Sequence, residues 1–184
     1  MTTLNILGIS GSLRAKSINT YALQAAGELM PEGMKLTIAS YADIPLYNQD
    51  VQDQGIPASV TRLCEEIARA DALIIASPEY NYSISGVLKN AIDWLSRTPV
   101  QPFKNKPVAL MSATGGPLGG ARNQYDVRKI LGALDALVLL KPEIFMGMAQ
   151  NRFDAEGKLT DAPTRKLVGD QMVALQAWIA RVKV

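Results

Sequence analysis

Residues 4–19 read LNILGISGSLRAKSIN, a short apolar run that leads into a loop of hydroxyl-bearing and basic residues and then into a helix. The run at residues 4–9 has the composition of a β-strand. From Ile18 onward, apolar residues recur at the three- and four-residue spacing of an amphipathic helix. A strand, a loop and a helix in this order are the repeating unit of an alternating α/β fold.

The same alternation continues along the chain. Further strand-like apolar runs cover residues 36–39, 72–76, 108–111 and 137–140, and helical periodicity covers residues 18–29, 60–67, 84–95, 127–134 and 168–182. The third and fifth runs are apolar throughout, which is typical of parallel strands covered by helices on both faces. We therefore predict one flavodoxin-like domain over residues 1–184, a doubly wound five-stranded parallel α/β sheet in the order 2-1-3-4-5.

The composition indicates an ordinary soluble globular protein. Of the 184 residues, 48% are hydrophobic and 20% are charged, and the net charge is only +2. No basic run exceeds two residues and no apolar run approaches the roughly 20 residues of a membrane span, so neither nucleic acid nor membrane is an expected partner. The N-terminus lacks the basic region of a signal peptide, and a single cysteine suits a reducing compartment. We expect a cytoplasmic protein.

The absence of histidine limits the chemistry most strongly. Without histidine, the chain cannot build a Ser-His-Asp or Cys-His apparatus or a histidine-ligated metal site. Cys64 is the single cysteine, so a CxxC redox pair is also excluded, and its place in an apolar helical stripe indicates core packing. An enzyme of this composition would depend on a bound cofactor for its chemistry.

In the predicted sheet order, ligands bind beyond the carboxyl ends of the strands, where strands 1 and 3 diverge. The loop after strand 1 offers donors from Ser12, Ser17 and Asn19 and a cation from Arg14 or Lys16. It lacks both the GxGxxG pyrophosphate signature and the nucleoside-triphosphate P-loop. The pattern therefore favours a terminal monophosphate such as that of FMN, with a plain serine-capped turn as the alternative.

Two other loops are predicted at the same edge. Residues 78–83 read PEYNYS, and two tyrosines with an amide suit a planar heterocycle with a polar edge. The alternative is a turn whose tyrosines cover the core. Residues 114–120 read TGGPLGG, and four glycines either let the backbone approach a ligand closely or form a flexible idle loop. The convergence of three such loops favours a ligand site. On the third helix, Lys89 and Asp93 form either a solvated i,i+4 pair or a subunit contact.

These motifs resemble a known family. GSLRAKSIN at residues 11–19, PEYNYSISGVLKNAIDWLSR at 78–97 and GGPLGGAR at 115–122, together with YADIPLYNQD at 41–50, resemble the NAD(P)H-dependent FMN reductases, with bacterial quinone and chromate reductases most similar. The resemblance extends over essentially the whole chain. It implies an FMN cofactor, NADPH or NADH as co-substrate, and a homodimer or homotetramer. Residues 85–95, with Arg122 and Tyr125, are the expected interface elements.

The resemblance also implies roles for individual residues. The FMN phosphate is expected at Ser12, Leu13, Arg14, Ser17 and Asn19; the isoalloxazine ring along Pro78, Glu79, Tyr80, Asn81 and Tyr82; and the opposite side of the flavin at Thr114 and Gly115. The chain departs from the family pattern at Ser85, where many relatives have proline. This serine could loosen or re-cap the start of the helix, and we expect FMN binding to survive it.

The resulting functional hypothesis is an NAD(P)H:quinone oxidoreductase. Hydride would pass from NAD(P)H to flavin N5 and onward to a small acceptor, with quinones, flavins, azo or nitro compounds and chromate all suitable. No side chain is needed as a catalytic acid or base, and Glu79 is expected to have a structural role. The alternatives are a flavodoxin-type electron carrier, which the charge of +2 disfavours, and a flavin-free module that binds a phosphorylated ligand.

Overall fold

The computed structural model describes residues 3–182, whose strands form one parallel sheet. The strands are β1 (Leu4–Ser10), β2 (Met34–Ile38), β3 (Ala72–Ala76), β4 (Pro107–Ala113), β5 (Leu137–Val138) and β6 (Ile144–Met146). Their order is β2-β1-β3-β4-β5, with β6 also paired to β4, and every pairing is parallel. The predicted flavodoxin-like order is confirmed.

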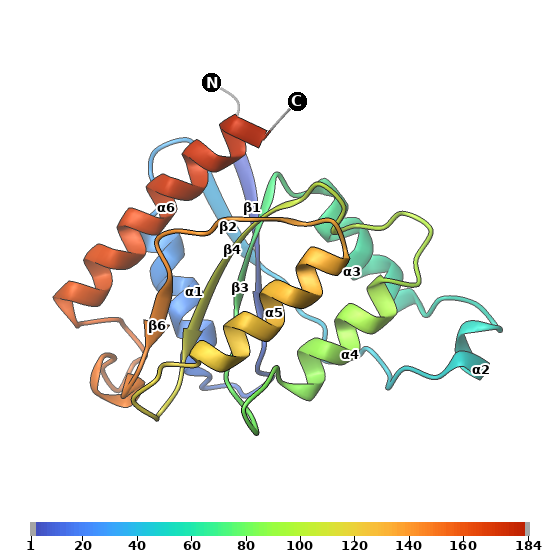
Figure 1. Ribbon diagram of the computed structural model, residues 1–184, viewed down its shortest axis with the longest axis horizontal. Coiled ribbons are helices and arrows are strands. Elements are labelled where there is room, and N and C mark those ends of the chain that lie inside the picture. The colour runs from blue at the N-terminus through green and yellow to red at the C-terminus, as the bar shows by residue number, and fades with distance from the viewer. Residues whose placement is uncertain (1–2, 183–184) are drawn as a thin grey trace.

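Helices cover both faces of the sheet (Figure 1). They are α1 (Ile18–Glu28), α2 (Gln49–Gln52), α3 (Ala58–Arg69), α4 (Gly86–Leu95), α5 (Ala121–Ala133) and α6 (Ala162–Val182), with a 3₁₀ turn, η1, at Ala149–Asn151. The apolar faces of α1 and α6 pack on one side, and those of α3, α4 and α5 on the other. All five predicted helices are confirmed, whereas α2 and η1 are too short to show a period and were not predicted.

The central strands carry the core. Every residue of β3 and β4 is buried, so the prediction for the third strand is confirmed. Alternate side chains of β3 point to opposite faces of the sheet. Ile74 packs in the hydrophobic cluster between the sheet and helices α1 and α6, whereas Leu73 and Ile75 pack in the cluster between the sheet and helices α3, α4 and α5. Full burial of one such side chain contributes about 1.5–3 kcal/mol. These two layers fix the strand ends, and hence the loops that follow them.

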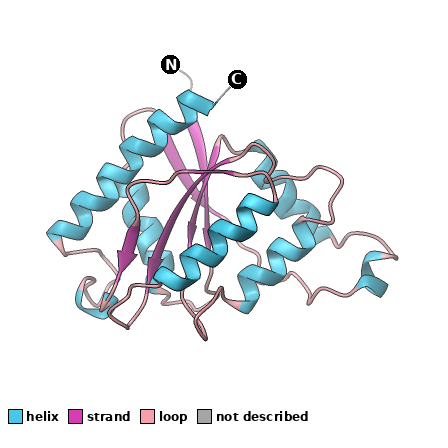
Figure 2. Cartoon of the chain, in the orientation of Figure 1, coloured by secondary structure: helices cyan, strands magenta, loops and turns pink. Residues whose placement is uncertain are grey.

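The prediction for the fifth strand is wrong beyond Val138. Only Leu137 and Val138 pair with the start of β4, and both are half-buried, so this strand is an edge and is not covered on both faces. Pairing resumes at β6, opposite the end of β4 (Figure 2). Leu139 N–H still donates to the Val108 carbonyl at 2.8 Å, while the Leu139 carbonyl accepts from Arg128 Nη1 at 3.2 Å. Farther along the gap, Pro142 has no N–H to donate to a ladder.

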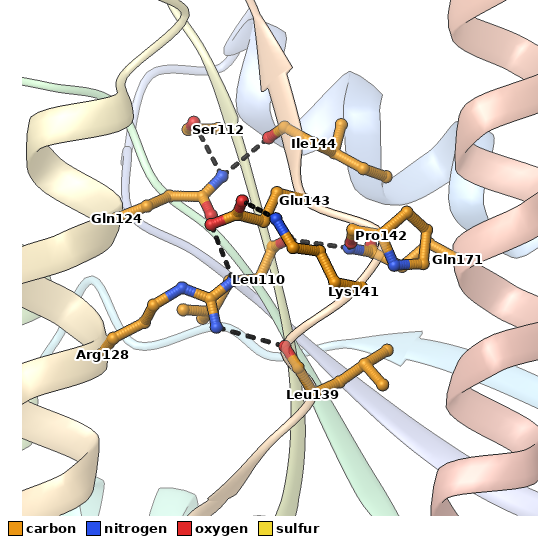
Figure 3. Close-up of polar contacts among 10 residues, drawn as sticks. All are labelled: Leu110, Ser112, Gln124, Arg128, Leu139, Lys141, Pro142, Glu143, Ile144 and Gln171. Carbon is orange, nitrogen blue, oxygen red and sulfur yellow. Dashed lines mark hydrogen bonds and ion pairs between the residues drawn. The ribbon is translucent and has the colours of Figure 1, made fainter.

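Buried amide side chains from both layers bridge this gap (Figure 3). From α6, the Gln171 side chain donates to the carbonyl oxygens of Leu110 (3.0 Å) and Pro142 (2.8 Å). From α5, the Gln124 side chain donates to the carbonyl oxygen of Ile144 at 2.6 Å. These contacts satisfy backbone groups that a continuous fifth strand would have paired. They hold β6, and the end of β4 beside it, in the sheet.

Two smaller predictions concern Cys64 and the pair of Lys89 with Asp93. Cys64 is 4% exposed and packs in the core, with its Sγ 3.4 Å from Thr98 Oγ1. Lys89 Nζ lies 2.7 Å from Asp93 Oδ1 on α4, with side chains 44% and 38% exposed. The predicted i,i+4 pair is therefore present, and its exposure fits both a solvated pair and a subunit contact. Among the helices of the described chain, none is long and apolar enough to span a membrane.

Candidate functional site

The loops after β1, β3 and β4 gather at one end of the sheet, the lower end in Figure 1, opposite the two termini. Together they line a pocket of about 160 Å³. Its lining includes most of the predicted site residues, namely Ser12, Arg14, Ser17, Asn19, Pro78, Glu79, Tyr80, Thr114 and Gly115. Ile18 and Ala113 complete it and were not predicted. The structure therefore brings three segments that are far apart in sequence to a single place.

Three predicted residues lie outside this pocket. Leu13 lines two neighbouring hollows instead. Asn81 and Tyr82 are exposed and form the tip of the second loop. These three residues are on the rim of the site and not in its wall.

The first loop has the properties of an anion site. Thr20 N–H donates to Ser17 Oγ at 3.4 Å, which makes Ser17 the N-cap of α1. The N–H groups that open a helix have no partner within it, and the helix dipole favours a negative charge there. Arg14 and Lys16 are exposed and take part in none of the ion pairs formed within residues 3–182. Hydrogen-bond donors and positive charges without an ion-pair partner therefore lie together in the first loop.

Two buried asparagines fix the helices that border the site. The side chain of Asn19 in α1 donates to the Ala113 carbonyl and accepts from the Ala113 N–H, both at 3.0 Å. In α5, the Asn123 side chain donates to the Ser77 carbonyl at 3.2 Å and accepts from Ser77 Oγ at 3.0 Å. The amide of Asn19 is therefore occupied, and its backbone N–H is the group left for a ligand. The role of Asn123 was not predicted, because no local pattern marks it.

The carboxylate of Glu79 caps α5. Its Oε1 accepts from Arg122 Nε at 2.8 Å and its Oε2 accepts from the Asn123 N–H at 3.3 Å. The helix has no cap of its own, because Gly120 occupies the N-cap position. The Glu79 side chain is only 12% exposed. This geometry fits the structural role predicted for Glu79, since a carboxylate at a helix N-terminus is stabilising.

The second loop ends in a tight turn. The backbones of Tyr80 and Ser83 exchange hydrogen bonds at 3.1 and 3.0 Å. Between them, Asn81 and Tyr82 both have left-handed backbones, with φ of 50° and 69°. Tyr80 is 48% exposed and Tyr82 69% exposed, so the alternative that these tyrosines cover the core is wrong. The Arg122 guanidinium carbon lies 3.7 Å from the centre of the Tyr82 ring.

The glycines of the third loop divide into two pairs. Gly119 and Gly120 are buried and left-handed, and an added Cβ would come within 2.5 Å of the Phe145 backbone and 2.8 Å of Ser112 Cβ, respectively. They serve packing within the protein, so the prediction that all four glycines could approach a ligand is wrong for this pair. Gly115 and Gly116 are exposed, with open space in front of Gly116. This pair remains accessible to a ligand.

The first and second loops are in direct contact. A Cβ on Gly11 would come within 2.9 Å of Pro78 Cδ, so only glycine fits here. The hydroxyl of Ser85 donates to the Gly11 carbonyl at 2.6 Å and makes no capping bond to its own helix. The expectation that the Ser85 side chain re-caps α4 is therefore wrong. Instead, this side chain joins the two loops.

Buried and charged groups next to the site are held in defined protonation states. Tyr41 donates to the Ser10 carbonyl at 2.5 Å, and burial raises the pKa of Tyr41, so its hydroxyl remains a donor at neutral pH. The Ser83 hydroxyl, and then Lys129, lower the pKa of the Asp126 carboxyl. Asp126 is therefore ionised where it meets the second loop.

Two larger hollows, of about 460 and 520 Å³, lie elsewhere on the molecule. Arg69 and Ala70, at the end of α3, line both of them. Neither includes the start of a helix, where unpaired N–H groups would gather. The smaller pocket at the carboxyl ends of the strands is therefore the better candidate on chemical grounds.

Comparison with known proteins identifies the family of the chain. The sequence profile of the family described as NADPH-dependent FMN reductase matches residues 4–151. The chain is 52% identical over 180 residues to the NAD(P)H-dependent FMN reductase of Pseudomonas aeruginosa, covering 98% of this chain and 97% of the relative. It is 45% identical over 184 residues to the quinone reductase of Escherichia coli strain K12, covering 98% of each.

A solved structure gives the same result. The flavoenzyme NAD(P)H:(acceptor) oxidoreductase FerB of Paracoccus denitrificans matches with a TM-score of 0.88 at 30% identity, covering 97% of this chain and 98% of that one. The resemblance inferred from the sequence motifs is therefore confirmed.

Proposed function

Since the chain belongs to the NADPH-dependent FMN reductase family and is an FMN-dependent oxidoreductase that uses NAD(P)H, we propose that its FMN binds in the pocket formed by the loops after β1, β3 and β4. We further propose that quinones are among its acceptors, as the name of the Escherichia coli relative suggests. The observation that carries the site proposal is the coincidence of an open helix N-terminus with two uncommitted cations in the first loop.

The residues present fit a phosphate monoester. Ser12, Arg14 and Ser17 all line the pocket, and the N–H groups that begin α1 are available beside them. Glu79 is the one carboxylate in the lining, and Arg122 neutralises it. A dianionic phosphate would therefore meet donors and positive charge without an opposing charge.

The dimensions fit a cofactor that is only partly enclosed. Pockets that bury a drug-sized ligand usually measure roughly 300–1,000 Å³, whereas this pocket measures about 160 Å³. It can enclose the phosphate end, while a planar ring would extend past Tyr80 and Gly115, which line the pocket and are exposed. An open rim gives a dinucleotide and an acceptor access to the same place in turn.

When bound, FMN supplies the hydride chemistry, and the chain supplies binding and orientation. The first loop neutralises the phosphate, and the second loop presents backbone groups and an aromatic surface. The nearby carboxylates are occupied, Glu79 by α5 and Asp126 by Ser83 and Lys129. We therefore assign both carboxylates to holding the loops and α5 in place, and propose no catalytic side chain.

We also propose that the protein is a homo-oligomer. An apolar hollow of about 410 Å³ lies beside the site, lined by Leu13, Leu46 and Val87 among others. Leu46 is 83% exposed, which is unusual for a leucine flanking an apolar hollow. Size-exclusion chromatography with light scattering would test this, and a Leu46→Glu variant should shift the protein toward the monomer. A monomeric parent protein would contradict the proposal.

The function is tested in one cuvette. The purified protein should show flavin absorption bands at roughly 370 and 450 nm, which bleach on anaerobic addition of NADPH and return on addition of a quinone. Bands that persist until a separate reductase is added would indicate an electron carrier instead. A colourless protein that takes up no added FMN would refute the proposed site.

A further inference from the structure

The second loop is bound to α5 at both of its ends. At the first end, Glu79 contacts Arg122 and Asn123, as described above. At the other end, Ser83 Oγ donates to Asp126 Oδ2 at 2.6 Å. We propose that Asp126 is a positioning residue for the flavin site: through Ser83, it fixes the turn of the second loop against α5. This inference rests on the proposed placement of FMN.

The turn needs such an anchor because its backbone is strained. Asn81 and Tyr82 both have positive φ, as in a type I′ turn, and the second of these positions normally holds glycine. Asparagine tolerates the left-handed conformation, whereas an aromatic residue rarely adopts it. Strained residues persist where surrounding contacts over-determine them. Within the loop itself, only the paired hydrogen bonds between Tyr80 and Ser83 close this turn.

The bond between Ser83 and Asp126 suits this role. It is short, its acceptor is an ionised carboxylate, and it is partly buried, so it is stronger than a bond between neutral groups. The second oxygen of Asp126 accepts from Lys129 Nζ at 2.9 Å, on the exposed side of the helix. One oxygen of Asp126 therefore holds the second loop, and the other contacts the exposed ammonium group of Lys129.

Releasing Ser83 should affect the loop more than the fold. The N-terminus of α5 would keep its cap from Glu79, and its buried contact with Ser77 through Asn123 would also remain. The turn would keep the contact between Arg122 and the Tyr82 ring, but it would lose its hydrogen bond to α5 and relax toward conformations with negative φ. The backbone groups proposed to face the flavin ring would then be less well ordered before binding, which weakens affinity for FMN.

The test is a double-mutant cycle on Ser83→Ala and Asp126→Ala. The readout is the FMN dissociation constant, measured by quenching of FMN fluorescence on titration with apoprotein, together with kcat and KM for NADPH. Each single change should weaken FMN binding about tenfold, the loss expected for a hydrogen bond to a charged group. The double variant should be no weaker than either single variant. Asp126→Asn keeps an acceptor oxygen and should restore binding to within about threefold.

Lys129→Ala is the matched control, because it removes the other partner of Asp126 without touching the loop, and it should bind FMN like the parent. Urea unfolding of each apoprotein separates loss of positioning from loss of stability. Losses that multiply in the double variant, or single variants with parental affinity, would overturn the inference. So would an Asp126→Asn variant as weak as Asp126→Ala. A parent protein that takes up no FMN would instead overturn the proposed site on which the inference rests.

Discussion

Replacing Glu79 tests whether its carboxylate only caps α5 or also transfers a proton during catalysis. In Glu79→Ala, the Asn123 N–H loses its acceptor and Arg122 loses its ion-pair partner. Loss of a helix cap costs about 1 kcal/mol. The ion pair adds about 1 kcal/mol or less, because the Arg122 side chain is 40% exposed and solvent screens it. The free energy of unfolding should therefore fall by about 2 kcal/mol.

For a chain of this length, that loss lowers the melting temperature by about 4–8 °C. Glu79→Gln retains one acceptor oxygen and should lose about half as much. The assays are thermal unfolding by circular dichroism and steady-state turnover with FMN and NADPH at saturation. Glu65→Gln is the control, because Glu65 is 57% exposed and paired at 3.5 Å with Arg69 on the surface of α3. Its effect should stay within about 0.5 kcal/mol.

Turnover gives the decisive comparison. If Glu79 only caps α5, kcat for Glu79→Gln should stay within about threefold of the parent, whereas loss of a general acid or base costs about 10²–10⁴-fold. A Glu79→Gln variant with the melting temperature of the parent and a hundredfold lower kcat would refute the structural interpretation. It would show that Glu79 transfers a proton despite its contacts with α5.

Three further predictions concern other parts of the chain. Arg14→Ala should raise the FMN dissociation constant about tenfold and leave the affinity for riboflavin, which has no phosphate, unchanged; fluorescence titration checks both, and an equal loss for the two ligands would contradict a phosphate contact. Ser85→Ala should leave the Gly11 carbonyl unpaired and lower the free energy of unfolding in urea by about 1–2 kcal/mol, whereas an unchanged midpoint would rule out an important link between the loops. The Thr164 hydroxyl and N–H, and then Arg152, lower the pKa of Asp161, so its stabilising effect is complete above a pH of about 4 and is lost as the pH falls through the depressed value. The difference in stability between the parent and Asp161→Asn, measured by urea unfolding at several pH values, should therefore be largest at neutral pH and vanish in strong acid; a difference independent of pH would contradict this.

The structural features that could be predicted are those that produce a local pattern in the sequence. Hydrophobic periodicity separates strands from helices, and the βα order with right-handed crossovers leaves few possible sheets. The carboxyl ends of parallel strands meet at one edge, so residues as distant as Ser12, Pro78 and Thr114 could be assigned to one pocket before any coordinates were known. The glycines at 119 and 120 were interpreted as positions where a ligand could approach the backbone, and this was wrong. The sequence did not reveal that the approaching group is the backbone near Phe145 and the side chain of Ser112.

The features that were missed depend on contacts between distant segments. Asn123 reaches Ser77 across 46 positions, and Gln171 reaches Leu110 across 61. A buried amide in a helix has no periodic signature, because its role depends on which carbonyl the fold places in front of it. The early end of β5 has the same origin: the apolar residues up to Leu140 fit a strand, but Pro142 and the side chains from α5 and α6 decide where the ladder stops.

Some polar groups around the pocket already have hydrogen-bond or ion-pair partners within the protein, and others do not. This difference explains how a chain without histidine can support redox chemistry. Asn19, Glu79 and Asp126 are all engaged with backbone or side-chain partners, and these contacts hold the loops in place. Among the described residues around the pocket, Arg14 and Lys16 form no ion pair, and the first N–H groups of α1 have no partner within the helix. The ring of Tyr80 is also exposed beside them. Those are groups that bind a phosphate and a planar ring. Reactivity would therefore lie in the cofactor, and an open rim with few selective side chains favours several acceptors over one.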